Sequence, residues 1–189
     1  MKARGRGDYD TPMPVDSASL SFAVWPTAWG PMGAVAGPGG LVRVVLPHYQ
    51  PDDLRALLAF EHPGAREDPR PFERLMVLSR QYFNGQEVSF DELSCVLLSE
   101  NRFAGRVLRA CRRIPYGQTR SYSWVADAAG NPAAARAAAA ALSRNPLPLV
   151  VPCHRVTYAD GRLGGFTSPG GVDLKRRMLA LEGLDAGVC

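Results

Sequence analysis

Lysine is almost absent from this 189-residue chain, because 20 of its 22 basic residues are arginine. The two exceptions are Lys2 and Lys175. Arginine presents a planar fork of donors that suits phosphates and base edges, so the bias fits a nucleic-acid partner. Genomic base composition produces the same bias, and the sequence leaves both explanations open.

Long hydrophobic runs are also missing. No apolar stretch reaches the roughly 18 to 20 residues that span a bilayer. The first twenty residues carry charge and proline where a signal peptide needs an apolar core. Because 46% of the residues are hydrophobic, the chain can still build packed cores. We therefore expect a soluble, cytoplasmic protein without a membrane partner.

Cysteine is scarce and widely spaced. The four cysteines are neither paired at zinc-ligand spacing nor dense enough for a disulfide scaffold. Cys95 and Cys111 lie in apolar sequence and are predicted to be small core residues, whereas Cys189 is a terminal thiol. The pattern fits a reducing compartment and predicts no metal and no cofactor.

Charge divides the chain into two unlike halves. Residues 1–100 carry 9 basic and 13 acidic side chains (net −4), and residues 101–189 carry 13 basic and 5 acidic side chains (net +8). The halves are therefore expected to face different partners. We predict a mobile tail over 1–17, a support domain over 18–97 and a functional domain over 98–189.

The first half shows the pattern of a small sheet covered by helices. Extended segments over 21–25, 33–36 and 41–46, separated by turn residues, predict an antiparallel meander. Apolar residues recur at helical spacing over 51–60 and 72–83. Nothing here has the spacing of a catalytic site, so the predicted role is structural support.

The second half contains a helix-turn-helix pattern. Ser121 is placed to cap a helix over 122–129, which Gly130 stops. Asn131 is then expected to cap an alanine-rich helix over 132–142. Two helices joined by a short glycine turn are typical of DNA-binding proteins.

The alanine-rich helix allows two interpretations. Alanine is the best helix former, so the helix could simply form easily and pack closely. Alternatively, a helix with so little side-chain bulk can approach a narrow groove, with Arg136 projecting from it. A major-groove reader would carry several polar side chains aimed at base edges, which this helix lacks.

A cysteine and a histidine follow a stiff apolar segment. Cys153 comes after Pro152 and is followed by His154. Thiolates attack electrophilic carbon whereas thiols hardly do, so such a cysteine needs a base, which His154 could supply through water. Glu182, at the end of a predicted helix over 173–182, could orient the imidazole. By themselves, the neighbouring cysteine and histidine also fit a packing role.

Glycines are dense between residues 160 and 171, where five occur in twelve positions. Such a segment can turn sharply and bring backbone close to a ligand, so it could form the wall of a pocket. It lacks the lysine pattern of a phosphate loop and the strand-to-helix context of a dinucleotide site. Nucleotide phosphate binding is therefore not expected.

The sequence over 145–156 resembles the active-site signature of the O6-alkylguanine-DNA alkyltransferases, also called methylated-DNA-protein-cysteine methyltransferases. The resemblance runs from about Phe103 to Gly183, with specific matches at 114–122, 130–132 and 179–183. Looser matches occur at 30–33, 41–47 and 82–85.

The resemblance implies an α/β (α+β) fold. A small antiparallel sheet with helices, ribonuclease H-like, would precede a helical domain with a winged-helix-like helix-turn-helix. It also implies direct-reversal repair, in which the protein binds double-stranded DNA, flips out an O6-alkylguanine and keeps the alkyl group. O4-alkylthymine is left open as a second substrate. The protein would be a monomer, with cooperative binding left open, and would lie on the nucleoid when bound to DNA.

The resemblance also assigns roles to residues. Cys153 would be the acceptor, and His154 with Glu182 would activate it through water. Tyr122 would crowd the phosphate beside the flipped nucleotide and donate toward the leaving guanine, and Asn145 would hold the hinge after the reading helix. The helix would enter the minor groove, with Arg136 in the emptied stack. Further DNA contacts would be Ala135, Ala139 and Arg144, and the substrate pocket would include Pro148, Val156, Phe166, Thr167 and Ser168.

Three rival functions fit less well. Lesion-binding relatives that only flag damage replace the acceptor cysteine, whereas Cys153 is present. A transcriptional regulator would need base-reading side chains beyond Arg136. A cysteine hydrolase would need an oxyanion site and a substrate groove, which the sequence does not indicate.

Overall fold

The computed structural model describes residues 19–184. The tail predicted over 1–17 and the terminal Cys189 lie outside these residues. Within the described range, no helix is both long enough and apolar enough to cross a lipid bilayer.

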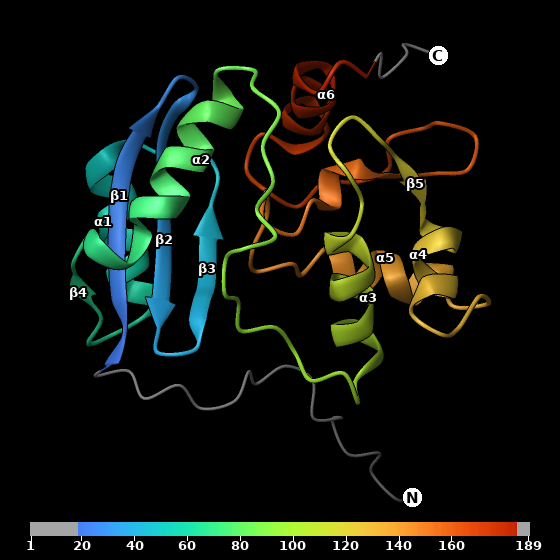
Figure 1. Cartoon of the computed structure of the whole chain (residues 1–189), viewed down its shortest axis with the longest axis horizontal. Coiled ribbons are helices and arrows are strands. Elements are labelled where there is room, and N and C mark those ends of the chain that lie inside the picture. The colour runs from blue at the N-terminus through green and yellow to red at the C-terminus, as the bar shows by residue number, and fades with distance from the viewer. Residues whose placement is uncertain (1–18, 185–189) are drawn as a thin grey trace, which may run out of the picture.

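A four-stranded sheet occupies the first half of the described chain (Figure 1). Its strands are β1 (Ser21–Thr27), β2 (Gly30–Gly37), β3 (Gly40–Val45) and β4 (Arg66–Glu67). The first three form the predicted antiparallel meander, with Trp25 opposite Met32 and Ala34 opposite Val44. The order across the sheet is β3-β2-β1-β4.

Strand β4 was not predicted, and it adds to the antiparallel meander an edge strand that pairs in parallel with β1. The pairing uses backbone groups: Arg66 N donates to Leu20 O at 3.0 Å, and Asp68 N donates to Phe22 O at 3.0 Å. Both residues of β4 are exposed. A two-residue edge strand without buried side chains leaves no alternation in the sequence, which is why no pattern indicated it.

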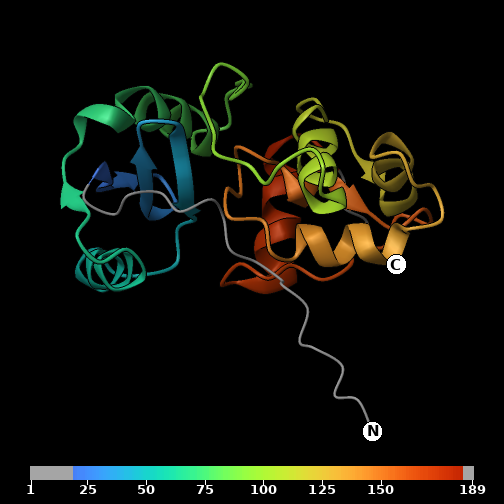
Figure 2. The ribbon, with the colours of Figure 1, turned by 90° about the horizontal axis from the view of Figure 1, so that it is seen from below.

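Helices α1 (Pro51–Glu61) and α2 (Glu73–Phe83) cover opposite faces of the sheet (Figures 1 and 2). Alternate side chains of the strands point to the two faces, so the sheet has two apolar surfaces. One packs against α1 through Phe22, Val35, Val45, Leu54 and Leu58. The other belongs to the main core, with Trp25, Ala34, Val44, Phe72 and Leu75. Both predicted helices are confirmed, and a 3-10 turn η2 (Arg70–Phe72) leads into α2.

The edge strand β3 joins the sheet to the second half. Leu41 N donates to Ser94 O at 2.9 Å, and Val96 N donates back to Leu41 O at 2.8 Å. Further along the strand, Val44 N donates to Pro146 O at 2.9 Å. The free edge of the sheet is therefore paired with the connecting segment and with the loop that precedes Cys153.

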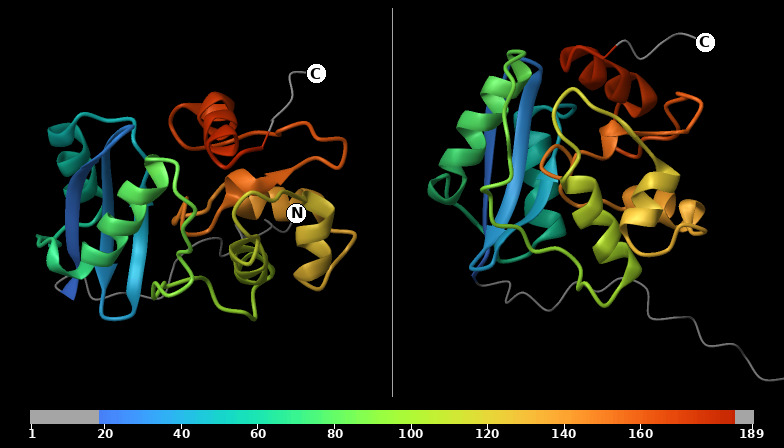
Figure 3. Two further views of the ribbon diagram at one scale, coloured as in Figure 1. Left: turned by 45° about the horizontal axis from the view of Figure 1, so that its top comes forward. Right: turned by 45° about the vertical axis from the view of Figure 1, so that its right-hand side comes forward.

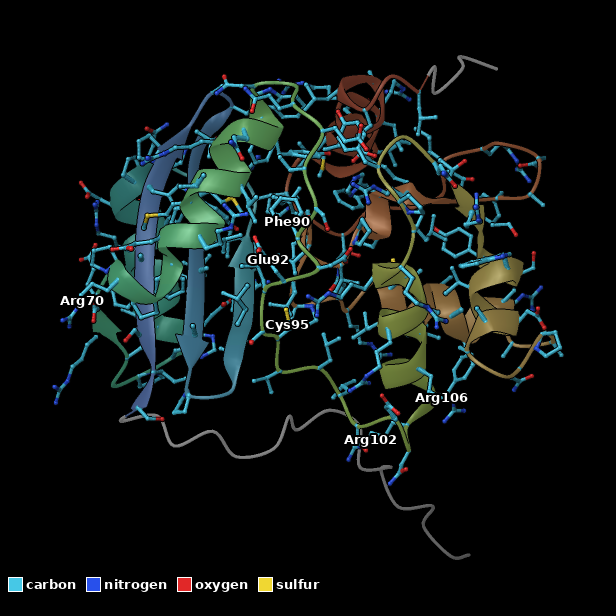
Figure 4. All side chains as sticks on the ribbon, viewed as in Figure 1. Arg70, Phe90, Glu92, Cys95, Arg102 and Arg106 are labelled. Atoms are coloured by element: carbon cyan, nitrogen blue, oxygen red, sulfur yellow. The ribbon has the colours of Figure 1, made fainter. Side chains whose placement is uncertain are left out.

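The connecting segment is fixed by arginines of α3. Figure 4 labels Phe90, Glu92 and Cys95 along this segment between the two halves. Arg112 donates to the carbonyl oxygens of Phe90, Asp91 and Leu93, and Arg109 donates to Leu98 O at 2.7 Å. These bonds satisfy backbone acceptors of a segment without regular structure.

The second half is mainly helical. Its elements are α3 (Phe103–Arg112), β5 (Arg120–Ser121), α4 (Tyr122–Ala128), α5 (Ala135–Leu142), η3 (Cys153–Arg155), β6 (Val156–Thr157) and α6 (Gly171–Leu181). Helices α3, α4 and α5 pack on one another, and β5 pairs in parallel with β6. The predicted cap is present, since Ser121 Oγ accepts from Trp124 N at 3.1 Å. Gly130, with φ +82°, ends α4 and permits the turn to α5.

Two predicted helix starts are wrong. The alanine-rich helix α5 begins at Ala135 rather than Pro132, because Ala134 N donates to Asn131 O at 3.0 Å and closes a turn. Proline fixes the φ angle that the second position of such a turn requires. At the other end of the half, α6 begins at Gly171, two residues before Asp173, and Glu182 is its C-cap.

Candidate functional site

Cys153 lies at the start of the 3-10 turn η3, after a tight apolar loop. Val151 N donates to Leu147 O at 2.8 Å, and Leu149 adopts φ +77°, a left-handed conformation unusual for leucine. The loop residues 147 and 149–151 are buried. The segment entering the cysteine is thus a buried turn, and packing holds it in a strained shape.

Asn145 connects this loop to the sulfur. Its Nδ2 donates to Val151 O at 2.8 Å and to Cys153 Sγ at 3.2 Å, while its Oδ1 accepts from Leu147 N at 3.0 Å. Asn145 N also donates to Leu142 O at the end of α5. One side chain therefore fixes the end of α5, the loop and the thiol relative to one another.

A cavity of about 960 Å³ opens beside Cys153. Both halves of the chain line it, with Val42 to Leu46 and Tyr49 from the sheet half. It collects nine of the predicted site residues: Tyr122, Ala139, Arg144, Asn145, Pro148, Cys153, Phe166, Thr167 and Ser168. The predicted pocket residue Val156 does not line it, because its side chain is completely buried in the core.

His154 and Glu182 form a buried pair behind the cysteine. His154 Nε2 lies 2.7 Å from Glu182 Oε1, and neither side chain has any exposed surface. An ionised carboxylate can only accept hydrogen bonds, so Nε2 must carry the proton. Nδ1 is then the basic nitrogen, and this buried atom has no hydrogen-bond partner among the described protein atoms.

Glu182 also accepts hydrogen bonds from three other residues. Arg155 donates from Nε to Oε2 at 2.9 Å and from Nη2 to Oε1 at 3.1 Å, and Gly117 N donates to Oε2 at 3.2 Å. Tyr82 of α2 donates to Oε1 at 2.8 Å. Burial alone would raise the pKa of Glu182, but the bonds and charges of His154 and Arg155 outweigh it and lower the pKa to about 2. The carboxylate is therefore ionised throughout the neutral range.

Arg155 and Tyr82 were not predicted as site residues. The only sequence signal for Arg155 is that it directly follows His154; its burial, with 6% exposure, and its pairing with Glu182 are seen in the structure alone. Tyr82 carried none, because its helical spacing in α2 is also that of a core residue. The sheet half therefore contributes a side chain to the site, which no sequence pattern indicated.

Burial favours the uncharged form of both Cys153 and His154. Burial raises the pKa of Cys153, although the Asn145 hydrogen bond and the charge of Lys175 oppose the rise. Burial lowers the pKa of His154 in spite of Glu182. At neutral pH the site thus holds a neutral thiol and a neutral imidazole that can accept a proton.

Lys175 is a buried cation that the sequence analysis did not place in the site. Its Nζ donates to the carbonyl oxygens of Val156 and Leu163 and lies 5.9 Å from the ring centre of Tyr122. Burial lowers its pKa to about 8. Lys175 ties the glycine-rich loop to β6 and adds positive potential near Cys153.

Tyr122 stands at the first position of α4, in the wall of the cavity. Its ring packs against Tyr158, with centroids 5.3 Å apart. A Cβ on Gly164 would lie 2.7 Å from the Tyr122 hydroxyl, so the loop passes directly over this group. Burial, followed by the neighbouring Tyr158 and the two cysteines, raises the pKa of Tyr122 to about 12, so the hydroxyl remains a donor.

Helix α5 presents one long side chain to solvent. Its buried residues are Ala138 and Leu142, whereas Arg136 is exposed. The side chain of Arg136 makes no hydrogen bond or ion pair with any other residue of 19–184. Ala135 and Ala139 are half-buried, and of these two only Ala139 reaches the cavity. The helix is therefore smooth except for one unengaged cation.

Comparison with known proteins gives concordant matches. Residues 102–184 match the family model described as "6-O-methylguanine DNA methyltransferase, DNA binding domain". The methylated-DNA--protein-cysteine methyltransferase of Methanothermobacter thermautotrophicus is 37% identical over 153 residues, which cover 81% of this chain and 80% of that protein. The protein of the same name from Mycolicibacterium paratuberculosis is 46% identical over 120 residues, 63% of this chain and 70% of that one.

Solved structures agree with the sequence matches. The crystal structure of Mycobacterium tuberculosis OGT in complex with DNA superposes with a TM-score of 0.70 at 33% identity. The superposition covers 88% of this chain and 96% of that chain. The similarity thus extends over the sheet half as well as the helical half.

Proposed function

The chain belongs to the methylated-DNA--protein-cysteine methyltransferase family, and on that basis we propose that it transfers alkyl groups from O6-alkylguanine in duplex DNA to its own Cys153. The observation that carries the proposal is the placement of Cys153 in the cavity wall, with its Sγ accepting a hydrogen bond from Asn145 Nδ2 at 3.2 Å. The buried His154 and Glu182 pair follows directly in the chain. These groups fit alkyl transfer better than lesion binding alone.

The DNA-binding surface is proposed to centre on α5. A helix of alanines can enter a minor groove, and the exposed Arg136 would occupy the space that the flipped base leaves in the stack. Arg144 and Ala139 line the cavity at the far end of this helix, so the base would pass from Arg136 toward Cys153. Flipping costs a few kcal/mol, less for a damaged base.

The chemical step is a direct displacement at the alkyl carbon. The Cys153 proton passes, through water, toward His154 Nδ1, whose lone pair is free because Nε2 donates to Glu182. The thiolate then forms the S–C bond while the C–O6 bond breaks, and the electron pair leaves with guanine. Guanine takes up one proton, which replaces the proton that Cys153 gave up. Tyr122, held protonated by burial, donates a hydrogen bond toward the leaving base.

The product explains single turnover. The acceptor becomes a thioether, which no group in the site can cleave. The DNA donates the alkyl group and the protein accepts it, so the transfer needs no other reactant. All the residues named above come from one chain, and we propose that the monomer is sufficient.

The two halves would have different tasks. We propose that 98–189 binds DNA and accepts the alkyl group, while 18–97 supports the site. The contacts between β3 and the loop before Cys153 favour this division, because Val44 N binds Pro146 O one residue after Asn145.

A titration tests the proposed function. Purified protein is mixed with an excess of duplex DNA that contains O6-methylguanine, and restored guanine is counted. We expect one guanine per protein chain and no further product after a second addition of DNA. Binding without restored guanine would instead identify a lesion-binding protein. A parallel duplex with O4-methylthymine measures the second substrate.

A further inference from the structure

Tyr82 reaches the His154 and Glu182 pair from the opposite half of the chain. Its hydroxyl donates to Glu182 Oε1 at 2.8 Å and lies 3.4 Å from His154 Nε2. The tyrosine belongs to α2, 100 residues before Glu182, and its side chain is completely buried. The end of α2 lies next to α6 in different views (Figures 1 and 3).

The position of this hydroxyl is fixed by packing. Phe83 and Tyr116 stand edge-on to the ring of Tyr82, with centroids 5.2 and 6.2 Å away, and Phe90 lies 6.2 Å away. Burial, strengthened by the neighbouring Glu182, raises the pKa of Tyr82 well above its usual value. The hydroxyl therefore keeps its proton and serves Glu182 as a permanent donor.

Glu182 Oε1 divides its negative charge among three donors, which are Tyr82, His154 Nε2 and Arg155 Nη2. A carboxylate oxygen that is bonded to other donors attracts an imidazolium less strongly. The other charged groups that act on His154 are the cations of Arg155 and Lys175, which also disfavour its protonation. Removing the Tyr82 hydroxyl would leave more of the Oε1 charge to His154.

We propose that Tyr82 is a positioning residue for alkyl transfer, which keeps His154 neutral and able to accept the Cys153 proton by sharing Glu182 Oε1. This inference rests on the proposed function. It gives the sheet half a chemical contribution, because the pH range of the reaction then depends on a side chain of α2.

The test compares Tyr82→Phe with Tyr116→Phe. Tyr116 makes a suitable control because its hydroxyl donates to the Leu181 carbonyl at 3.0 Å, beside Glu182 but not to the carboxylate. Single-turnover transfer from O6-methylguanine duplex is measured from acid to mild alkaline pH for wild type and both variants. Thermal unfolding monitors folding.

We expect Tyr82→Phe to move the acid midpoint of the rate profile upward by about half a pH unit, an approximately threefold rate loss on the acid side. The plateau rate and the Tyr116→Phe midpoint should match wild type. If the wild-type protein transfers the alkyl group but Tyr82→Phe has the same acid midpoint as wild type, the inference is overturned and the proposed function still stands. A purely structural role would lower stability or active fraction without moving the midpoint.

A second measurement tests the inference even if Tyr82→Phe does not fold or the wild-type protein does not transfer the alkyl group. Nitrogen NMR shifts of His154, one of three histidines, report its protonation in the wild-type protein. We expect a neutral ring at neutral pH with the proton on Nε2 and a bare Nδ1. A charged ring, or a proton on Nδ1, would contradict the role of Tyr82 whatever the protein does to DNA.

Discussion

The Nδ2 atom of Asn145 lies 3.2 Å from the sulfur of Cys153 and donates a hydrogen bond to it. The same nitrogen binds Val151 O, and Oδ1 binds Leu147 N. The amide thus serves two purposes that are usually separate. It holds a strained loop together, and it favours the thiolate at an acceptor whose pKa burial raises.

Replacing Asn145 should therefore affect both stability and reactivity. In Asn145→Ala the carbonyl of Val151 and the amide of Leu147 lose their partner, which should cost about 1–3 kcal/mol of unfolding free energy. Loss of the bond to sulfur should slow alkyl transfer by about tenfold or more. Asn101→Ala serves as control, because Asn101 is exposed and only its backbone N–H is bonded. Unchanged transfer in folded Asn145→Ala would contradict the role of the sulfur bond.

Arg136 should matter for duplex DNA and not for chemistry. Arg136→Ala removes the only long side chain of the smooth helix, so transfer from duplex O6-methylguanine should fall far more than transfer from a free alkylated base. Arg66→Ala removes the same charge from the exposed strand β4, at the edge of the sheet opposite β3. It should leave the transfer rates from duplex DNA and from the free base unchanged. Equal losses on both substrates would refute insertion into the stack.

Glu182 should dominate the acid stability of the protein. Its pKa falls from 4.5 to about 2 on folding, so its stabilisation is fully present above pH 4.5 and disappears as the pH falls toward 2. The difference corresponds to about 3 kcal/mol. Glu182→Gln also leaves Arg155 buried without its partner, and we expect a loss of about 3–5 kcal/mol at neutral pH. The deficit relative to wild type should shrink in acid.

Denaturant unfolding at several pH values measures this effect. Glu67→Gln is the control, because Glu67 pairs with Arg55 at 3.0 Å on the surface, where solvent screens the two charges and loss of the pair should change stability little. A constant difference between wild type and Glu182→Gln down to pH 2 would show that Glu182 is not the group that titrates.

The contact between Gly164 and Tyr122 can be tested with two matched substitutions. Gly164 (φ +69°) and Gly161 (φ +87°) both adopt left-handed conformations, so alanine should cost roughly 1 kcal/mol at each. Only at Gly164 would the new Cβ meet the Tyr122 hydroxyl, at 2.7 Å, while Gly161 has open space. We expect Gly164→Ala alone to slow alkyl transfer. Equal transfer rates in the two variants would show that the contact between Gly164 and Tyr122 does not affect alkyl transfer.

The fold was largely predictable because its elements carry strong local signals. The meander, α1, α2 and the capped helix α4 follow from alternation, helical spacing and the Ser121 cap. Strand β4 was missed because it forms by backbone pairing alone, and the start of α5 was misplaced because Pro132 fits a turn as well as a first helical residue.

The site was predictable where its residues are neighbours in sequence or match a family motif. Cys153 and His154 are adjacent, and the resemblance supplied Asn145 and Glu182. Tyr82 could not be found in this way, because only the packing of α2 against the second half brings its hydroxyl to the carboxylate. Val156, which the resemblance places in the pocket, is buried in the core and does not line the cavity.

The acceptor role of Cys153 is the central claim, and peptide mass after reaction tests it most directly. Protein incubated with O6-methylguanine duplex should gain the mass of one methyl group, on the peptide that contains Cys153, with saturation at one per chain. Cys95→Ala should behave as wild type, because Cys95 does not line the cavity that Cys153 borders. No mass gain on the Cys153 peptide, or a gain that persists in Cys153→Ala, would contradict the account.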